Sequence, residues 1–253
     1  MKAIIPAAGH GTRFLPVTRV IPKEMLPIGA KPALELIVDE AKRAGADEIV
    51  MVISRGKELI RDYFKDDPSI SFAYQLEQKG LGHAVLQAEA SVAAGGPGEL
   101  ALILLGDALV AGCDAAKEMA AVSAAHGGAG VVGLEHVPQE KISRYGIVKL
   151  EGDRIVDLVE KPQPEEAPSD LAIAGRYQLP TKIFDYLKTQ APGKGGEIQL
   201  TDAIRRMVQD MSQSNNRTVE QSNSLYGYVY PGRRQDIGNP QGYLNALLAM
   251  KGV

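Results

Sequence analysis

The 253-residue sequence has little cysteine and contains no long apolar segment. Its single cysteine, Cys113, excludes an intramolecular disulfide and is typical of a protein from a reducing compartment. The longest apolar run, Leu100–Leu105, is far shorter than a membrane span. Met1 and Lys2 lead directly into an apolar strand, without the apolar core of a signal peptide. We therefore expect a cytoplasmic protein with no membrane partner.

The sequence also lacks an excess of charge of either sign. It has 28 Lys and Arg residues against 31 Asp and Glu residues, a formal net charge of −3. This balance gives no broad basic surface, so nucleic acid is not expected as a partner. No internal repeat or low-complexity tail is present. The length is sufficient for one large buried core, and we expect a single domain over residues 1–253.

Apolar runs alternate with amphipathic segments along the chain, which is the βαβ pattern of a mostly parallel sheet. The expected fold is α/β and Rossmann-like, with a mixed twisted sheet flanked by helices. We expect strands at 2–6, 48–53, 70–75, 100–105, 130–136 and 225–230. We expect helices at 32–44, 57–64, 113–125, 180–189 and 241–250, and two more that end near 94 and 211. A polar link is expected at 212–224.

The stretch that follows the first strand consists of small residues and ends on a cation. It runs Ala7-Ala8-Gly9-His10-Gly11-Thr12-Arg13. Small residues let backbone N–H groups approach an anion, and Arg13 adds a planar donor fork suited to phosphate. The stretch therefore indicates a polyphosphate cradle, although two glycines alone are also compatible with a plain tight turn. Phe14 replaces the third glycine of the dinucleotide fingerprint, and the lysine of a P-loop is missing.

A long proline-containing loop continues from Arg13 to Pro32 and carries further cations. Long loops inside compact domains are usually functional or disordered, and this one is too apolar for disorder. The small-residue stretch, together with Pro22-Lys23-Glu24-Met25-Leu26-Pro27, resembles the signature of sugar-1-phosphate nucleotidylyltransferases. The Pro-Lys-Glu-Met form is similar to the uridylyltransferase branch of that family. The resemblance extends from residue 3 to about residue 247.

A second candidate site follows the strand at 70–75. Gln75 lies five residues before Gly80, and a glutamine amide with a glycine backbone offers both a donor and an acceptor to a base edge. By itself Gln75 better fits an ordinary polar residue at a strand end. The resemblance implies pyrimidine recognition by Gln75 and Gly80, with Gln78 as a possible substitute for the glutamine. The resemblance implies that the nucleotide contacts Ala7, Ala8, Gly9, Gly11, Thr12, Arg13, Lys23, Gln75 and Gly80.

The apolar run at 100–105 ends in Gly106-Asp107, which places a carboxylate at the carboxyl edge of a parallel sheet. Aspartate is a hard oxygen ligand suited to Mg²⁺, although a helix-capping or turn role is the alternative. The uridylyltransferases usually carry a second Asp at the position of Ala108. The resemblance also implies that Asp236, in Asp-Ile-Gly-Asn, is the second metal ligand, whereas the residues alone indicate a turn.

Alternating apolar and polar residues on either side of a Gly-Asp turn at 151–153 predict a two-stranded hairpin. The hairpin suggests a small inserted β-rich sugar-binding portion. We expect residues 1–135 to bind mainly the nucleotide and residues 136–253 mainly the sugar. Lys161 offers a charge for the sugar phosphate, although a surface Glu-Lys pair is the alternative. The resemblance implies that the sugar phosphate contacts Gly106, Tyr145, Gly146, Glu160, Lys161, Gly175 and Glu197.

The expected activity is formation of UDP-glucose and pyrophosphate from UTP and a sugar 1-phosphate, expected to be glucose 1-phosphate, by Mg²⁺-dependent direct displacement. The expected catalytic residues are Arg13, Lys23, Asp107 and Lys161. Two alternatives stay open: a thymidylyltransferase that uses dTTP, and a non-catalytic nucleotide-sugar sensor. The short link Phe64–Ser71 is similar to thymidylyltransferases, because uridylyltransferases carry an extra segment there. A homo-oligomer, dimer or tetramer, is expected.

Overall fold

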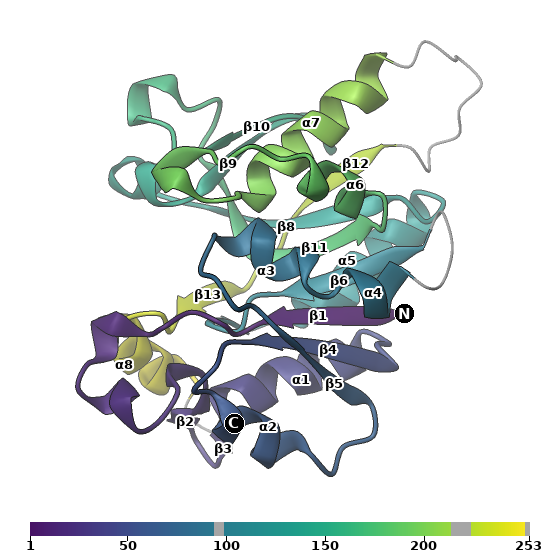
Figure 1. Cartoon of the computed structure of the whole chain (residues 1–253). Coiled ribbons are helices and arrows are strands. Elements are labelled where there is room, and N and C mark those ends of the chain that lie inside the picture. Colours follow the sequence, from purple (N-terminus) through teal and green to yellow (C-terminus); the bar gives the residue numbers. More distant parts are fainter. Residues whose placement is uncertain (94–98, 214–223, 251–253) are drawn as a thin grey trace.

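The computed structural model of the chain describes residues 1–93, 99–213 and 224–250. Within these residues a nine-stranded mixed sheet forms the centre of the molecule, in the order β5-β4-β1-β6-β11-β8-β12-β10-β9 (Figure 1). The strands are β1 (Lys2–Pro6), β4 (Glu48–Ile53), β5 (Ile70–Tyr74), β6 (Leu100–Leu104), β8 (Gly130–His136), β9 (Gly146–Glu151), β10 (Arg154–Glu160), β11 (Leu171–Pro180) and β12 (Leu225–Val229).

The sheet has a parallel part and a mixed part, in which β8 and β12 are parallel and the other pairs are antiparallel. β5, β4, β1 and β6 are parallel neighbours, with Ile4 opposite both Val50 and Ile103. Their carboxyl ends therefore meet at one edge of the sheet. β11 runs antiparallel to both β6 and β8, and the β9–β10 hairpin forms the far edge with Glu160 opposite Gly146. The Rossmann-like α/β fold is thus confirmed.

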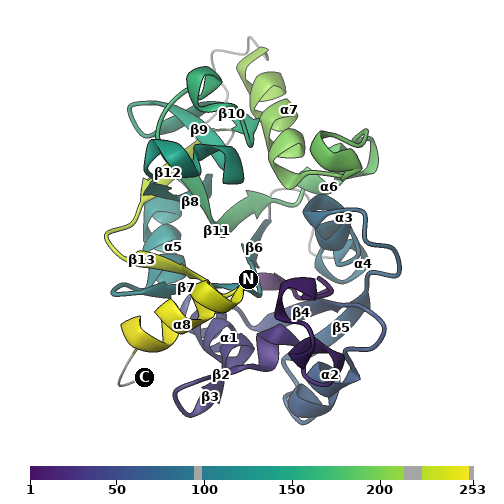
Figure 2. The same ribbon diagram turned by 90° about the vertical axis from the view of Figure 1, so that its left-hand side faces the viewer.

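Helices cover both faces of the sheet, because alternate strand residues point to opposite sides. Ile4 packs in the core cluster with α3 (Leu81–Leu86), α4 (Glu89–Val92), α6 (Ile183–Lys188) and α7 (Leu200–Gln213). Ala3 and Ile5 pack in the other cluster with α1 (Ala33–Arg43), α2 (Glu58–Phe64) and α5 (Ala115–Ala125). Figure 2 shows α3, α4, α6 and α7 on the right of the sheet and α5 on its left.

Two small sheets were not expected from the sequence. β7 (Ala108–Ala111) pairs with β13 (Arg233–Asp236), and β2 (Pro27–Ile28) pairs with β3 (Lys31–Pro32). β13 leads into α8 (Pro240–Ala249), whose first turn is capped by the side chain of Asn239 accepting from the Gly242 N–H at 2.9 Å. The β7–β13 pair matters most for function, because it directly follows Asp107 and ends on Asp236.

Two expected helices differ from the structure. The helix that ends near residue 94 is split into α3 and α4. In a continuous helix the backbone N–H of Gln87 would donate to the carbonyl of His83. Here the side-chain amide of Gln87 donates to that carbonyl instead, at 3.0 Å. The helix expected at 180–189 begins only at Ile183, because Pro180 still belongs to β11. Residues 214–223 of the expected polar link lie outside the described residues. None of the described helices is both long and apolar enough to span a membrane.

Candidate active site

The loop after β1 forms one wall of a cavity at the carboxyl edge of the sheet. Ala7 and Ala8 are buried, whereas Gly9 is exposed, and a β-carbon placed on Gly9 would touch nothing within 4 Å. The cavity measures about 310 Å³, a volume within the usual range for small-ligand sites. It brings together several of the predicted nucleotide-binding and sugar-binding residues, namely Ala7, Ala8, Gly9, Lys23, Gln75, Gly80, Asp107 and Glu197.

Gly106 joins the end of β6 to the end of β1. Its N–H donates to the carbonyl of Pro6 at 3.1 Å, and a β-carbon on Gly106 would lie 2.7 Å from that same oxygen. Only glycine permits this approach without displacing the strand. The contact holds the Asp107 backbone beside the glycine loop, so Gly106 has a structural role in addition to any predicted contact with the sugar phosphate.

Asp107 and Asp236 converge at the same edge, although they are far apart in the sequence. β13 pairs with β7 so that Asp236 lies opposite Ala108, and the Ile237 N–H donates to the carbonyl of Asp107 at 2.9 Å. A β-carbon on Gly238 would lie 2.9 Å from Oδ1 of Asp236 and 3.2 Å from Oδ2 of Asp107. Both carboxylates therefore flank one point in space.

Lys23 lies against these acids from the proline-containing loop. It opens a 3₁₀ turn at Lys23–Met25, its side chain is 9% exposed, and its Nζ lies 2.5 Å from Oδ2 of Asp107. Burial opposes the charge of Lys23, but Asp107 and Glu24 outweigh it and raise the pKa of the lysine. Burial likewise opposes the charge of Asp107, but Lys23 lowers the pKa of that carboxyl. The two groups form a charged pair in the cavity wall.

A second buried pair, Lys57 with Glu24, was not expected from the sequence. Nζ of Lys57 donates to both carboxylate oxygens of Glu24, at 2.9 and 2.8 Å, and to the carbonyl of Ala7 at 2.6 Å. Burial lowers the pKa of Lys57, despite the opposing effect of Glu24. The pair ties the proline-containing loop to the glycine loop. In the sequence, only the position of Lys57 pointed to this pair. Lys57 comes shortly after β4, a parallel strand that ends at the same edge of the sheet as β1.

Arg176 is a further buried charge that sequence reasoning missed. It is fully buried in β11 and donates to both carboxylate oxygens of Glu40 in α1, at 2.8 and 2.7 Å. It also donates to the carbonyl of Ala108 at 2.7 Å, directly after Asp107. Gly175, which was expected to contact the sugar phosphate, accepts from the Leu105 N–H at 3.0 Å and supports the same turn.

Four other predicted sugar-binding residues lie at the open end of the β9–β10 hairpin, outside the lining of the cavity: Tyr145, Gly146, Glu160 and Lys161. The Lys161 N–H donates to the carbonyl of Tyr145 at 3.0 Å, and Nζ of Lys161 lies 2.8 Å from Oε1 of Glu160. Lys161 has a left-handed backbone, with φ of 47°, which is rare for a residue other than glycine and is enriched at functional sites. Among the predicted sugar-binding residues that follow Asp107 in the sequence, only Glu197 lines the cavity, where it lies beside Gly80.

Three predicted nucleotide-binding residues, Gly11, Thr12 and Arg13, are not brought into the cavity, and the predicted metal ligand Asp236 is not part of its lining either. Thr12 and Arg13 are exposed in a 3₁₀ turn at Thr12–Phe14 and lie outside the cavity lining. Gly11 starts this turn with φ of 65°, and its carbonyl accepts from the Thr18 hydroxyl at 2.9 Å. The roles of Thr12 and Arg13 therefore stay predictions.

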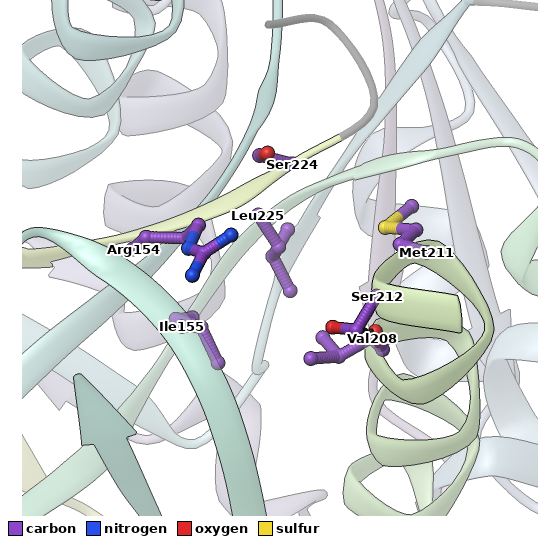
Figure 3. Close-up of a pocket in the computed structure, with 7 residues that line it drawn as sticks. All are labelled: Arg154, Ile155, Val208, Met211, Ser212, Ser224 and Leu225. Atoms are coloured by element: carbon purple, nitrogen blue, oxygen red, sulfur yellow. Dashed lines mark hydrogen bonds between the residues drawn. The ribbon is translucent and has the colours of Figure 1, made fainter. Parts of the chain in front are cut away.

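Another hollow lies between α7, β10 and β12 (Figure 3). It measures about 40 Å³, which is too small for a nucleotide. None of the predicted site residues lines it. It is lined by Arg154, Ile155, Val208, Met211, Ser212, Ser224 and Leu225.

The fold and the site together define an α/β protein with a charged cavity at the carboxyl edge of parallel strands, the place where such folds commonly bind phosphorylated ligands. The model of the nucleotidyl transferase family matches residues 2–251, and the chain belongs to that family.

Curated relatives are similar over nearly the whole chain. The chain is 40% identical to a UTP–glucose-1-phosphate uridylyltransferase of Staphylococcus haemolyticus, over 98% of this chain and 91% of the relative. It is 38% identical to a protein of the same name from Staphylococcus epidermidis, with the same coverage.

Solved structures are similar as well. A UDP-glucose pyrophosphorylase complexed with UDP-glucose superposes with a TM-score of 0.85 and 36% identity, over 98% of this chain and 97% of that one. A UTP-bound enzyme from Acinetobacter baumannii gives a TM-score of 0.78 and 32% identity, over 98% and 92% of the two chains. A putative glucose-1-phosphate thymidylyltransferase from Bacillus anthracis, with a TM-score of 0.81, is only 23% identical over 100% and 96%, and shares the fold.

Proposed function

We propose that the protein transfers a uridylyl group from UTP to glucose 1-phosphate and releases pyrophosphate. The observation that carries this proposal is the convergence of Lys23, Asp107 and Asp236 on one point beside the glycine loop. The names of the similar uridylyltransferases support the choice of substrates. Their identity extends over nearly the full chain, so the proposal concerns the whole protein rather than one part of it.

The proposed reaction is a direct displacement. An oxygen of the sugar phosphate attacks the α-phosphorus of UTP, a new phosphoanhydride bond forms, and the bond to the β-phosphate breaks to release pyrophosphate. The attacking oxygen is already anionic, so no protein nucleophile and no general base is required. The chain then contributes by holding the phosphates in line and by neutralising their charge.

The two carboxylates fit a divalent cation, and we propose Mg²⁺ with Asp107 and Asp236 as its protein ligands. Mg²⁺ prefers one or two carboxylates together with phosphate oxygens and water. Among the described residues, no three His, Cys, Asp or Glu side chains gather into a complete metal site. A two-carboxylate site that is completed by substrate oxygens agrees with both facts. When bound, the ion supplies charge neutralisation at the phosphates.

The cations of the chain have separate proposed roles. Lys23 lies in the cavity wall and neutralises the triphosphate from the side of Asp107. Arg13 lies outside the cavity, so its proposed contact with the leaving pyrophosphate requires the exposed turn to move inward. Lys161 is proposed to hold the sugar phosphate, and Glu197 to accept hydrogen bonds from sugar hydroxyls. The first 135 residues would then serve mainly the nucleotide and the remainder mainly the sugar.

We also propose that the protein is a cytoplasmic homo-oligomer. Leu15, Val17 and Val20 are exposed in the proline-containing loop, and Leu244 and Leu248 are exposed on α8. The Phe14 and Tyr243 rings meet edge to face at 6.2 Å, so the loop and α8 are adjacent. Exposed apolar surface of this kind often marks a protein interface. Light scattering after size exclusion tests this part, and a monomer at micromolar concentration would contradict it.

The activity is tested with the purified protein, glucose 1-phosphate and Mg²⁺, with UTP and dTTP assayed separately. UDP-glucose should form together with an equal amount of pyrophosphate, and UTP should be the better substrate. The Asp107→Asn and Asp236→Asn variants should lose most of the activity. Faster turnover of dTTP would favour a thymidylyltransferase, and binding of UDP-glucose without any turnover would favour a sensor.

A further inference from the structure

The side-chain amide of Gln75 is held on two sides in the cavity wall. Gln75 is 2% exposed, and its Nε2 lies 3.1 Å from the carbonyl oxygen of Gly80. The same nitrogen lies 3.1 Å from Nδ1 of His83 in α3. Both Gln75 and Gly80 line the cavity. The amide therefore has little freedom to rotate before a ligand arrives.

These contacts determine which way the amide points. A backbone carbonyl can only accept a hydrogen bond, so the group of Gln75 that faces Gly80 must be the NH₂. The second amide hydrogen points to Nδ1 of His83, which accepts it when the ring is neutral with its proton on Nε2. The amide of Gln87 lies 3.3 Å from Nε2 of His83, and it already donates to the carbonyl of that residue. We assign the acceptor nitrogen of the ring to the shorter contact, the one from Gln75. The Nε2–H then faces the Gln87 amide, which is held by the carbonyl of His83 and makes no hydrogen bond to the ring.

The groups that remain free form a defined pattern. Within the described residues, Oε1 of Gln75 accepts no hydrogen bond and the N–H of Gly80 donates none. An acceptor and a donor thus remain for a ligand in the cavity. Uracil presents an N3–H donor next to a carbonyl acceptor, which complements this pair. Cytosine presents the reverse pattern, an acceptor at N3 and a donor at the 4-amino group.

We infer that His83 is a positioning residue that selects uracil over cytosine by fixing the amide of Gln75. The inference rests on the proposed use of UTP. With His83 in the Nε2–H tautomer, a half-turn of the amide would place Oε1 against two acceptors, the Gly80 carbonyl and the unprotonated Nδ1 of His83. Without His83 only the Gly80 carbonyl opposes that rotation. The rotated amide would donate to N3 of cytosine, so loss of His83 should weaken the discrimination between UTP and CTP.

The test compares kcat/KM for UTP and CTP in the wild type and in His83→Leu, which removes the acceptor. The ratio of the two values should fall about tenfold, which corresponds to roughly one hydrogen bond. The change should appear mainly in KM for the nucleotide, with kcat for UTP within about twofold of the wild type. His83→Asn should restore most of the ratio, because its Oδ1 lies at the δ position and can accept from Gln75.

Two controls separate this role from a general structural one. His136→Leu removes an exposed histidine on β8 that pairs with Asp170, and it should leave the ratio unchanged. ¹⁵N spectra of the histidine side chains in the wild type should show an unprotonated Nδ1 for the resonance that disappears in His83→Leu. Thermal unfolding of each variant verifies that the fold is retained.

The outcomes are distinguishable. If the wild type turns over no UTP, the proposed function fails. If the wild type is active but His83→Leu keeps the ratio within twofold, the inference about His83 is overturned while the function stands. A protonated Nδ1 in the wild type also overturns it. A fall in the ratio that His83→Asn does not reverse would indicate a packing effect of the ring and would contradict the hydrogen-bond role.

Discussion

The proposed nucleotide region and the proposed sugar region of this protein carry similar charges but hold them differently. The nucleotide region comprises the glycine loop, Lys23, Glu24, Lys57, Asp107 and Asp236. The sugar region comprises Tyr145, Gly146, Glu160, Lys161 and Glu197. In the first, the side chain of Lys23 is 9% exposed and pairs with an acid from a distant strand. In the second, the side chain of Lys161 is 36% exposed and pairs with its own neighbour, Glu160.

This difference follows from how each region is built. Parallel strand ends bring distant charges together at one edge, and those charges are locked by burial. A hairpin places sequence neighbours together, and here the side chain of Lys161 is 36% exposed although Glu160 is only 10% exposed, so the lysine is less confined by burial than Lys23. We therefore expect the nucleotide region to be organised before binding and the sugar region to adjust to its ligand.

The largest effect is expected at the junction of the two regions. Arg176→Met should lower the free energy of unfolding by about 3–5 kcal/mol, because it leaves Glu40 charged and buried without a partner. Urea denaturation measures the change. The double variant Arg176→Met/Glu40→Leu should recover much of the loss, because it removes both charges. A loss below about 1 kcal/mol in the single variant would contradict this role of the pair.

The next effect concerns the buried charges of the nucleotide region. Lys23→Ala and Asp107→Ala should each lower turnover at least about a hundredfold, the usual cost of removing one electrostatic stabiliser. Initial rates at saturating substrates measure this. Asp62→Ala and Lys65→Ala, at exposed positions on and after α2, should keep normal rates. Near-normal turnover in either site variant would remove the contrast between the two regions.

A smaller effect is expected from the sugar region. Lys161→Ala should raise KM for glucose 1-phosphate about tenfold, as expected for loss of one charged hydrogen bond, and leave KM for UTP within twofold. Steady-state kinetics with each substrate varied in turn provide the measurement. Lys149→Ala, exposed on the same hairpin, is the matched control. An equal rise in both KM values would show that the two regions do not act separately.

The smallest expected effect is on the pH dependence of stability and concerns Glu135. This carboxylate pairs with Arg234 at 2.6 Å, and the guanidinium of Arg234 lies over the ring of Tyr145. Burial raises the pKa of Glu135 above its usual value near 4.5, even though Arg234 opposes the change. Between the two pKa values the folded state binds more protons than the unfolded state, so this residue costs stability as the pH rises.

Glu135→Gln should therefore gain stability relative to the wild type as the pH rises from 4 to 8. Urea unfolding at both pH values gives the comparison, with the exposed Glu165→Gln as control. If the stability of Glu135→Gln relative to the wild type falls with increasing pH, then Arg234 outweighs burial in setting the pKa of Glu135.

Much of the fold follows from local patterns in the sequence. The strand at 130–136 was expected with its observed bounds, and the hairpin turn at 151–153 joins β9 to β10 as expected. Asp107 was expected at the carboxyl edge because an apolar run ends in Gly-Asp, and the structure places it there. These features depend on residues close together in the chain, so alternation and turn residues are sufficient to predict them.

Other features were missed because they depend on pairing between distant segments. β7 is a strand only because β13 pairs with it, and neither segment has a strong pattern of its own. Glu24 and Lys57 appear in the sequence as ordinary charged residues, and only their burial beside Ala7 distinguishes them. The helix expected at 180–189 begins at Ile183 because β11 continues to Pro180.

The sequence by itself indicated the kind of ligand to expect, since small residues, a cation and an acid at strand ends are typical of phosphate sites. Only the tertiary structure decided which charges meet: Lys23 lies on Asp107, Arg176 on Glu40, and Arg13 remains outside the cavity. The physical reason is that Coulomb interactions and burial depend on distances in space, which a chain sets only once its strands have paired.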